Sequence, residues 1–199
     1  MLITNEDNIK LMARYEDNYF DLAIVDPPYR DSNQPTKDMR ANGSMKSLEG
    51  RPSKEYWSEL NRVSKEQIIW GANYMIDKIK KPSMGWIYWD KMNGSSDFSD
   101  GELAYTSFER ALRSFKYHLS KDRCKRFHPT QKPVQLYEWL LMVYAKEGDK
   151  ILDTHLGSGS IASACHNLGF DLTACELDKE YYEAAMKRIK EHQSQLRII

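Results

Sequence analysis

The sequence predicts an α/β protein whose sheet is doubly wound and mostly parallel, with helices on both faces. Candidate strands alternate with helical segments along the chain, which is typical of βαβ units. One apolar strand leads into a proline turn and another into a glycine turn, and open α/β sheets bind ligands at the carboxyl ends of their strands. The 199 residues, 41% of them hydrophobic, suffice for a single domain over residues 1–199.

Seven short segments have the apolar, β-branched or aromatic character of strands. They are residues 1–4, 22–25, 67–70, 85–89, 102–108, 150–154 and 172–175. Two helices are also indicated. Pro133 is suited to open one of them, because its fixed φ fits a first helical turn. Asp178 is a suitable N-cap for the other, whose apolar positions follow a helical spacing at Tyr182, Ala185, Met186 and Ile189.

The overall composition limits the class of protein. Lys and Arg balance Asp and Glu at 29 each, so any contact with nucleic acid must come from a local basic patch. Cys124, Cys165 and Cys175 form no disulfide or metal-binding pattern, and we expect buried cysteines in a reducing cytoplasm. No signal-peptide profile and no apolar run of about 18 residues is present. These features predict a soluble cytoplasmic protein with no metal and no membrane segment.

The proline turn is the most informative motif. Residues 22–25 form a continuous apolar run, as in a strand buried on both faces, and Asp26-Pro27-Pro28-Tyr29 follows directly. Each proline fixes its own φ and lacks an N–H, so the turn presents backbone carbonyls rigidly. A carboxylate, a stiff carbonyl and an aromatic ring can together hold a planar base and accept hydrogen bonds from its amino group. The alternative is an acidic turn after an ordinary strand.

The glycine turn is the second motif. A predicted strand leads into Gly157-Ser158-Gly159 and then into a helix, so that the backbone and the free N–H groups of the helix can approach a ligand. The next strand ends at Glu176, 17 residues beyond Gly159. An acid at this position in nucleoside-binding sheets hydrogen-bonds ribose hydroxyls. Alternatively, Glu176 helps to cap the helix that begins near Asp178.

A rigid segment, Arg-Phe-His-Pro-Thr-Gln-Lys-Pro at residues 126–133, lies between the two turns. The order Asp-Pro-Pro-Tyr, His-Pro-Thr-Gln-Lys-Pro, Asp-x-x-x-Gly-Ser-Gly and a strand-ending acid resembles that of the permuted β group of amino-methylating DNA methyltransferases. The resemblance covers almost the whole chain. It implies a Rossmann-like methyltransferase sheet with circularly permuted motif order, in which the catalytic half precedes the half that binds S-adenosylmethionine.

The resemblance also implies roles for individual residues. In the rigid turn made by Pro27 and Pro28, the Asp26 carboxylate and the Pro27 carbonyl would accept hydrogen bonds from the target amine, and Tyr29 would stack on the base. The cofactor would lie against Gly157 and Gly159, with its ribose on Glu176 and its methionine end near Thr130 and Lys132. Asp7, 19 residues before Asp26, matches the acid near the cofactor's adenine. Asp153 would shape the turn or meet the cofactor's ammonium, and His128 and Ser158 complete the expected set.

The sequence departs from the family in two respects. Thr154 and His155 replace the usual Pro-Phe before the glycines, and we interpret His155 as a packing substitute rather than a base. Only 98 residues separate Tyr29 from His128, too few to include a large target-recognition domain. We therefore expect DNA contacts from a mobile loop at residues 30–54, from the turn 90–101, or from residues 116–132, and such a small footprint also suggests a homodimer. The basic candidates are Arg30, Lys37, Arg40, Lys121, Arg123, Lys125 and Arg126.

Several alternatives remain open at this point. The basic cluster can instead be a solvated loop, and Asn73 or Tyr74 can line the pocket of the target base. Asp rather than Ser at the head of the tetrapeptide favours adenine N6 in double-stranded DNA, by resemblance. Cytosine N4 in DNA and adenine in RNA are the nearest rivals, and protein glutamine is disfavoured because the related sequences begin the tetrapeptide with Asn. A catalytically silent partner that binds cofactor or DNA belongs to another class, and the intact tetrapeptide argues against it.

Overall fold

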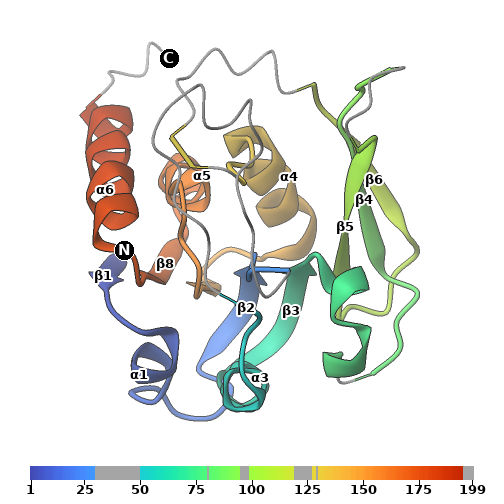
Figure 1. Cartoon of the computed structure of the whole chain (residues 1–199), viewed down its shortest axis with the longest axis horizontal. Coiled ribbons are helices and arrows are strands. Elements are labelled where there is room, and N and C mark those ends of the chain that lie inside the picture. Colours follow the sequence, from blue (N-terminus) through green and yellow to red (C-terminus); the bar gives the residue numbers. More distant parts are fainter. Residues whose placement is uncertain (30–49, 80, 95–98, 119–126, 129, 195–199) are drawn as a thin grey trace.

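The computed structural model describes residues 1–29, 50–79, 81–94, 99–118, 127–128 and 130–194. Its described part contains one sheet with the strand order β1-β8-β7-β2-β3-β5-β4-β6 (Figure 1). The strands are β1 (Leu2–Asn5), β2 (Phe20–Val25), β3 (Ser64–Trp70), β4 (Trp86–Asp90), β5 (Gly101–Thr106), β6 (Arg113–Lys116), β7 (Lys150–Asp153) and β8 (Asp171–Glu176).

The pairing of the strands is mixed but mostly parallel. β1, β8, β7, β2 and β3 pair in parallel along the sheet, and β6 pairs in parallel with β4. β5 is antiparallel to both of its neighbours, β3 and β4. The strand order departs from the chain order between β2 and β7, which places the first and last parts of the sequence side by side at the middle of the sheet.

Helices cover both faces of the sheet (Figure 1). α4 (Val134–Tyr144), α5 (Ser160–Leu168) and α6 (Lys179–Ser194) lie on one face, and α1 (Asn8–Met12) and α3 (Lys54–Val63) lie on the other. The short 3-10 helices η1 (Ala72–Tyr74) and η2 (Ile76–Lys78) follow β3.

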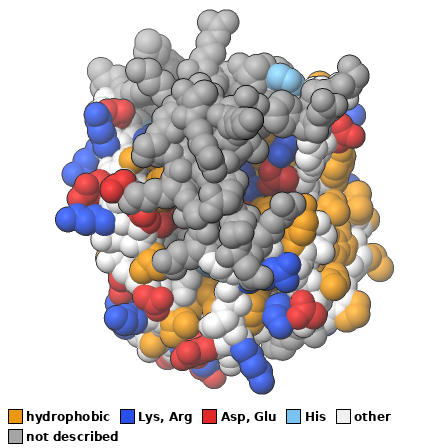
Figure 2. Space-filling model, in the orientation of Figure 1, with side chains coloured by type: hydrophobic (Ala, Val, Ile, Leu, Met, Phe, Trp, Pro, Cys, Tyr) orange, Lys and Arg blue, Asp and Glu red, His pale blue; other side chains and the backbone are white. Residues whose placement is uncertain are grey.

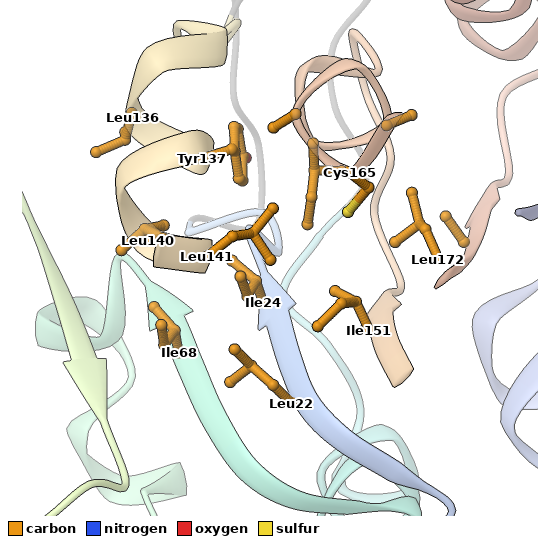
Figure 3. Packing of buried hydrophobic residues seen from close by; sticks show 14 of the residues in the cluster. Leu22, Ile24, Ile68, Leu136, Tyr137, Leu140, Leu141, Ile151, Cys165 and Leu172 are labelled. Carbon is orange, nitrogen blue, oxygen red and sulfur yellow. The ribbon is translucent and has the colours of Figure 1, made fainter. Parts of the chain in front are cut away.

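Alternate residues of β2 belong to two different cores. Leu22 and Ile24 pack with Ile68, Leu140 and the other residues of the core under α4, α5 and α6 (Figure 3). The intervening Ala23 and Val25 pack in the second core, under α1 and α3. All four side chains are essentially buried, so burial of apolar area on both faces fixes the register of the strand that ends at Asp26.

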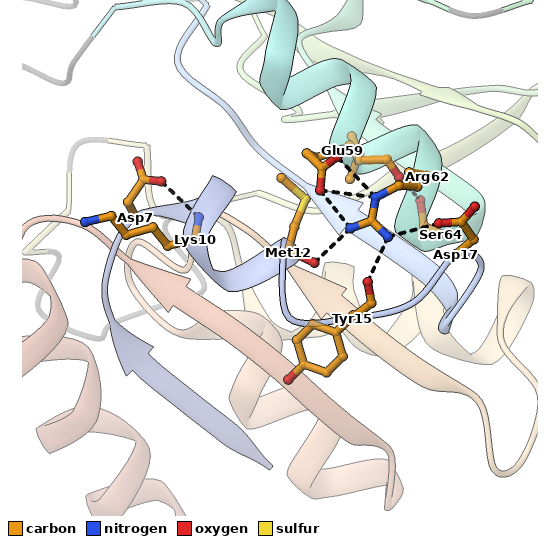
Figure 4. Close-up of polar contacts among 9 residues, drawn as sticks. Asp7, Lys10, Met12, Tyr15, Asp17, Glu59, Arg62 and Ser64 are labelled. Atoms are coloured by element: carbon orange, nitrogen blue, oxygen red, sulfur yellow. Dashed lines mark hydrogen bonds and ion pairs between the residues drawn. The ribbon is translucent and has the colours of Figure 1, made fainter.

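Arg62 ties the second helical layer together (Figure 4). Its guanidinium donates to the carbonyls of Met12 and Tyr15 at 3.1 and 2.8 Å, and it forms ion pairs with Asp17 and Glu59. The Glu59 carboxylate and Asp17 raise the pKa of Arg62 above its usual value. These contacts join the connection between α1 and β2 to the end of α3.

The predicted fold class is confirmed, and each of the seven predicted strands overlaps an observed one. The helices at Pro133 and Asp178 are also confirmed: α4 begins at Val134, and the Asp178 carboxylate accepts hydrogen bonds from the N–H groups of Glu180 and Tyr181 at the start of α6. The sequence did not predict β6, whose four residues are Arg-Ser-Phe-Lys and which pairs only with β4. The short helix α1 and the helix α3 were also missed.

Hydrophobic side chains also reach the surface. Figure 2 shows them gathered at the end of the molecule formed by β4 and β6. The large exposed apolar residues of the described segments from η1 to β6 are Tyr74, Ile76, Met84, Met92 and Leu112.

Candidate active site

A cavity of about 690 Å³ opens at the carboxyl ends of β2, β7 and β8. Its wall is formed by the start of α1, the Asp26 turn, the start of α3, the segment before α4, the glycine turn and the beginning of α6. Eleven of the thirteen predicted catalytic and cofactor-binding residues line it: Asp7, Asp26, Pro27, Pro28, Tyr29, His128, Thr130, Lys132, Gly157, Ser158 and Glu176. Asp153 and Gly159 are the two that do not.

The end of β2 places the Asp26 carboxylate against Lys132. Lys132 Nζ forms an ion pair with Asp26 Oδ2, and the Tyr29 hydroxyl donates to Asp26 Oδ1 at 2.5 Å. The backbone of Lys132 is held in place, because the hydroxyl of Ser160 on α5 donates to its carbonyl at 2.6 Å. The turn, the segment before α4 and α5 therefore converge on one carboxylate.

The charge on Lys132 is shared with a second carboxylate that the sequence did not single out. Glu102, at the start of β5, lies 3.2 Å from Lys132 Nζ through Oε2 and 2.6 Å from Lys91 Nζ through Oε1. The Lys132 side chain is only 1% exposed, so the two carboxylates rather than solvent balance its charge. Asp90, which precedes Lys91, accepts instead from the N–H of Met92.

Burial and charge set the protonation of this cluster. Burial raises the pKa of Asp26, and the like charge of Glu102 adds to this effect while Lys132 opposes it. Burial opposes the charge on Lys132, but Asp26 and Glu102 outweigh that effect and raise its pKa. Burial also disfavours the charge on Glu102, yet Lys132 and Lys91 lower its pKa to about 2. Lys132 and Glu102 are thus charged at neutral pH, and Asp26 is the carboxylate of the cluster whose pKa is raised.

The Tyr29 ring occupies a slot that a glycine leaves open. A Cβ on Gly71 would lie 2.1 Å from Tyr29 Cε1, and Gly71 has a φ of 66°, which favours glycine. The other neighbour of the ring is Tyr74, whose ring is stacked at a centroid distance of 5.4 Å and an angle of 11°. The turn after β3 therefore sets the position of the ring predicted to stack on a base, and it brings Tyr74, one of two candidates for the base pocket, beside it.

The glycine turn and Glu176 are joined by hydrogen bonds. The N–H of Gly157 donates to Glu176 Oε2 at 2.8 Å, and the N–H of Asp178 donates to Oε1 at 3.0 Å. Glu176 thus supports the start of α6 and also lines the cavity, while its hydrogen bonds to ribose hydroxyls stay a prediction. Burial raises its pKa, and the two N–H groups oppose that rise. Each carboxylate oxygen keeps acceptor capacity beyond the one N–H that it accepts.

Gly159 and Asp153 serve the shape of the turn. A Cβ on Gly159 would lie 2.9 Å from Ile189 Cδ1, so this glycine permits α6 to pack closely behind the turn. Asp153 Oδ1 accepts from the N–H of His155 at 2.9 Å, and burial raises the pKa of Asp153 to about 8. Of the two roles offered for Asp153, this contact supports that of shaping the turn.

His128 and Thr130 form the side of the cavity nearest the glycine turn. The His128 ring packs against Gly157 and against the Tyr181 ring, at a centroid distance of 4.5 Å. Its Nδ1 lies 3.3 Å from the Thr130 hydroxyl. Burial and the nearby charge of Lys132 lower the pKa of His128 to about 4, so the ring is neutral at neutral pH.

Asp7 and His155 connect α1 to the turn after β7. Asp7 is the N-cap of α1, because its Oδ1 accepts from the N–H groups of Ile9 and Lys10. Figure 4 shows the bond to Lys10. The next residue, Asn8, lies 3.2 Å from His155 Nε2 through its Nδ2, and His155 Nδ1 lies 2.9 Å from the Thr154 hydroxyl. Because the Asn8 amide nitrogen is a donor, Nε2 accepts and Nδ1 carries the hydrogen. Burial lowers the pKa of His155 to about 4. His155 therefore lines the cavity and connects α1 to the turn after β7, in addition to being a packing residue.

Several predicted residues lie outside the described part of the chain. They include all seven basic candidates for DNA contact, namely Arg30, Lys37, Arg40, Lys121, Arg123, Lys125 and Arg126, together with most of the loop 30–54 and Cys124. Within that loop, Arg51 lines the cavity and donates to the carbonyl of Tyr29 at 3.0 Å, and Lys54 begins α3. Cys165 and Cys175 are buried, as expected.

The described residues lack two further kinds of element. None of their helices is long and apolar enough to cross a membrane. They also contain no group of three or more His, Cys, Asp or Glu side chains arranged to hold a metal ion.

Comparison with known proteins places these features in a family. Residues 53–187 match the family model described as DNA methylase of the N6 and N4 type. The chain is 30% identical over 227 aligned positions to the type II methyltransferase M.HpaI of Haemophilus parainfluenzae, covering 91% of this chain and 71% of the relative. A match to the type II methyltransferase M2.DpnII of Streptococcus pneumoniae is shorter, at 41% identity over 32% of this chain and 24% of the relative.

Solved structures share the fold. The M1.HpyAVI–SAM complex superimposes with a TM-score of 0.65 at 21% identity, over 94% of this chain and 98% of the other. The PvuII DNA methyltransferase, which is cytosine-N4-specific, gives a TM-score of 0.66 at 12% identity, over 96% and 90%. The family model covers most of the chain, and the motifs on which the resemblance rested lie around one cavity. The chain belongs to the DNA methylase family whose members methylate exocyclic N6 or N4 amines.

Proposed function

We propose that this protein is an S-adenosylmethionine-dependent methyltransferase that modifies the N6 amine of a flipped adenine in double-stranded DNA. The observation that carries the proposal is the convergence of Asp26 and Glu176 on one cavity. Asp26 heads the turn that the family resemblance assigns to the target amine, and Glu176 is the strand-ending acid assigned to the cofactor's ribose. A methyl donor and a methyl acceptor must meet in one place, and this cavity provides it.

The chemistry of the cavity fits the proposed cofactor. Its volume of about 690 Å³ lies within the usual range for small-molecule sites. Glu176 is fixed by two backbone N–H groups and retains lone pairs for hydroxyl groups, and Asp7 lines the same wall. When bound, S-adenosylmethionine supplies a methyl group on a positively charged sulfur. The cofactor positions that the resemblance assigned to Asp153 and Gly159 remain predictions, since neither residue lines the cavity.

The residues of the proline turn suit a weakly nucleophilic amine. The lone pair of an exocyclic amine on adenine is delocalised into the ring, and hydrogen bonds from the amine to Asp26 and to the Pro27 carbonyl would localise it on nitrogen. Asp26 can accept such a bond only when it is ionised. Lys132 favours that form, and the buried position makes each contact stronger than in water. The rate would then depend on positioning, because the nitrogen must approach the methyl carbon in line.

Tyr29 and its neighbours support a flipped base. A base inside a duplex cannot reach a carboxylate at the end of a buried strand, so the target must be extruded into the cavity. The Tyr29 ring, held against Gly71 and beside Tyr74, is an aromatic part of the cavity lining on which a base can stack. Adenine rather than cytosine is proposed because Asp, and not Ser, precedes the two prolines.

The partners of the protein follow from this substrate. Double-stranded DNA would be contacted by the basic residues between positions 30 and 54 and between 116 and 132, which stays a prediction from the sequence. A homodimer is proposed to supply the surface that a chain without a large recognition domain lacks, and sedimentation velocity with and without DNA tests it. A DNA substrate would place the protein in the cytoplasm of a bacterial or phage-infected cell.

Nucleoside mass spectrometry tests the proposal. The purified protein is incubated with duplex DNA of varied sequence and with isotope-labelled S-adenosylmethionine, beside duplex and single-stranded RNA of matched sequence. Labelled N6-methyladenine from DNA alone is the expected result. Labelled N4-methylcytosine would keep the family chemistry and overturn the choice of base. Label in RNA only would overturn the choice of nucleic acid, and cofactor binding without any label would favour a catalytically silent partner.

A further inference from the structure

Lys132 lies between two carboxylates, and only one of them has a role in the proposed reaction. Asp26 approaches Nζ from the turn after β2, and Glu102 approaches it from β5 at 3.2 Å. Glu102 belongs to the antiparallel part of the sheet, where it is paired in register with Trp89, next to Asp90 and Lys91. Lys91 Nζ contacts the other oxygen of Glu102 at 2.6 Å. The cluster therefore contains two carboxylates and two lysine ammonium groups, and Glu102 contacts both ammonium groups.

We propose that Glu102 is a positioning residue that serves as the constant counter-ion of Lys132, so that Asp26 is free to exchange between Lys132 and the target amine. This inference rests on the proposed methyl transfer. It assigns a role to a residue that contacts neither the base nor the methyl donor and that acts only through Lys132.

The need for a second counter-ion follows from burial. The Lys132 side chain is 1% exposed, and leaving a buried ammonium without a partner is strongly unfavourable. If Asp26 were the only partner of Lys132, every weakening of their contact would leave the buried ammonium charge unpaired. The lysine would then hold Asp26 tightly and compete with the amine for its lone pairs. With Glu102 at 3.2 Å, Lys132 stays paired while Asp26 turns to the substrate.

The proton balance of the reaction also requires a second counter-ion for Lys132. As the bond between the amine nitrogen and the methyl carbon forms, the bond from that carbon to sulfur breaks, and the electron pair of the broken bond stays on sulfur. The nitrogen becomes positively charged and must release one proton. If the Asp26 carboxylate accepts it, Asp26 becomes neutral and no longer balances Lys132. Glu102 then carries that balance alone until the proton passes to water.

The other described groups around Asp26 cannot serve as the counter-ion of Lys132 while Asp26 is neutral. The Tyr29 hydroxyl donates to Asp26 and is kept neutral, because burial and the Asp26 charge raise its pKa well above the usual value. Tyr137 on α4 is likewise neutral, since burial and the Asp26 charge raise its pKa. Asp153 on β7 is a further acid in the neighbourhood, but burial raises its pKa to about 8 and its oxygen serves the N–H of His155. Among the described residues, Glu102 is the ionised acid on Lys132 besides Asp26.

The test replaces Glu102 and measures Asp26. In protein labelled with ¹³C at aspartate carboxyls, without DNA or cofactor, the Asp26 signal is assigned as the one that Asp26→Asn lacks. Removing the like charge of Glu102 is expected to move the Asp26 titration midpoint in Glu102→Gln to lower pH. Lys91→Gln keeps the Glu102 carboxylate but removes one of its cations, so it is expected to move the midpoint in the opposite direction. Glu138→Gln, the same change on α4, is the matched control and leaves the midpoint unchanged.

The kinetic arm uses duplex DNA and S-adenosylmethionine. In Glu102→Gln we expect kcat to fall about tenfold, with the KM for DNA within about threefold of wild type. The acid limb of the kcat profile moves to lower pH, and Glu102→Asp restores it towards wild type. A merely structural role would lower stability and leave the acid limb in place.

The two arms separate this inference from the proposed function. An unchanged Asp26 midpoint in folded Glu102→Gln, or an unchanged acid limb, overturns the role of Glu102. If Glu102→Gln does not fold, a Lys91→Gln midpoint that moves to lower pH, with the carboxylate still present, overturns it instead. Absence of methyl transfer by the wild-type protein would overturn the proposed function, whereas the titration in the protein alone does not depend on activity.

Discussion

Single residues in the cavity combine burial with a protonation state that the reaction needs. Asp26 is buried, which raises its pKa, yet it must be ionised to accept a hydrogen bond from an amine. Burial likewise disfavours the charged forms of His128 and His155, so both rings are neutral. A base catalyst among these histidines is therefore not required to explain the site.

We expect Asp26 to set the pH dependence of methyl transfer. Because burial raises its pKa, kcat is expected to be constant above that pKa and to fall tenfold per pH unit as the pH drops through it. His128 and His155, whose pKa values are lowered to about 4, remain neutral over this range. Rates of methyl transfer measured from pH 5 to pH 9 at saturating substrate check this, and a rate that rises towards low pH would contradict it.

The raised pKa of Asp153 predicts that this residue makes the protein less stable as the pH rises. An ordinary carboxylate, whose pKa is lowered on folding, has the opposite effect. Its pKa is raised by burial to about 8 in the folded protein, so between about pH 4 and pH 8 the unfolded chain has already lost the proton that the folded chain keeps. Stability from this residue is present at low pH and is lost as the pH rises. Asp153→Asn cannot ionise, so its advantage over wild type grows with pH.

Thermal unfolding without cofactor measures this effect. Between pH 5 and pH 8 the difference in Tm between Asp153→Asn and wild type is expected to grow by about 7–15 °C, because three pH units below a pKa of about 8 correspond to about 3–4 kcal/mol. Asp171→Asn, at the exposed start of β8, serves as the control. A difference for Asp153→Asn that stays constant with pH would show that the carboxyl is ionised in the folded state.

At the scale of elements, turns at strand ends decide where the functional side chains lie. The turn after β2 presents Asp26, the turn after β3 forms the slot for Tyr29, and the turn after β7 meets Glu176 at the end of β8. β2, β3, β7 and β8 run parallel to one another, so their carboxyl ends share one edge of the sheet.

Gly71→Ala tests the turn after β3. The added methyl group would overlap the Tyr29 ring at 2.1 Å, so the ring must move, and its hydroxyl would move away from Asp26. We expect kcat to fall by about tenfold or more while cofactor affinity, measured by calorimetry, changes little. Gly169→Ala has a comparable φ of 78° and no atom within 4 Å of the added Cβ, so it carries the backbone strain alone. Equal activity of both variants would mean that the Tyr29 slot is unimportant.

Arg62→Ala tests the second helical layer. It removes two bonds to backbone carbonyls and two ion pairs that join α3 to the connection after α1, and we expect unfolding free energy to fall by about 1–3 kcal/mol. Lys65→Ala removes one exposed ion pair with Asp21 and should leave the unfolding free energy almost unchanged. Urea denaturation compares them. A smaller loss for Arg62→Ala than for Lys65→Ala would show that the cluster in Figure 4 adds no stability.

The elements also show how much could be read from the sequence. Strands with continuous apolar runs, such as β2 and β7, were predicted because burial on both faces leaves no polar alternation. β6 could not be predicted, because its four residues carry two charges and it gains its partner only from β4, distant in sequence. The role of Glu102 was invisible for a related reason. It depends on the antiparallel return of β5, which brings Glu102 to Lys132, 30 residues further along the chain.

At the scale of the whole molecule, the cavity is assembled from both ends of the chain. The pairing of β2 with β7 brings the Asp26 turn beside the glycine turn, although they lie more than 120 residues apart. The order of the motifs predicted this meeting through the family resemblance, whereas their spacing alone did not. The resemblance could not show that Lys132 contacts Asp26 directly, since that contact depends on side-chain packing between the two halves.

The most direct test of the account is the single-turnover rate of Asp26→Asn against wild type, with labelled S-adenosylmethionine and duplex DNA. The substitution keeps the size of the side chain but removes the charge that localises the lone pair of the amine. We predict a rate lower by about 10²–10³, as for loss of one preorganised hydrogen-bonding group, with the dissociation constant of the cofactor within about threefold of wild type. A variant that binds cofactor normally and transfers the methyl group at the wild-type rate would contradict the central role of Asp26.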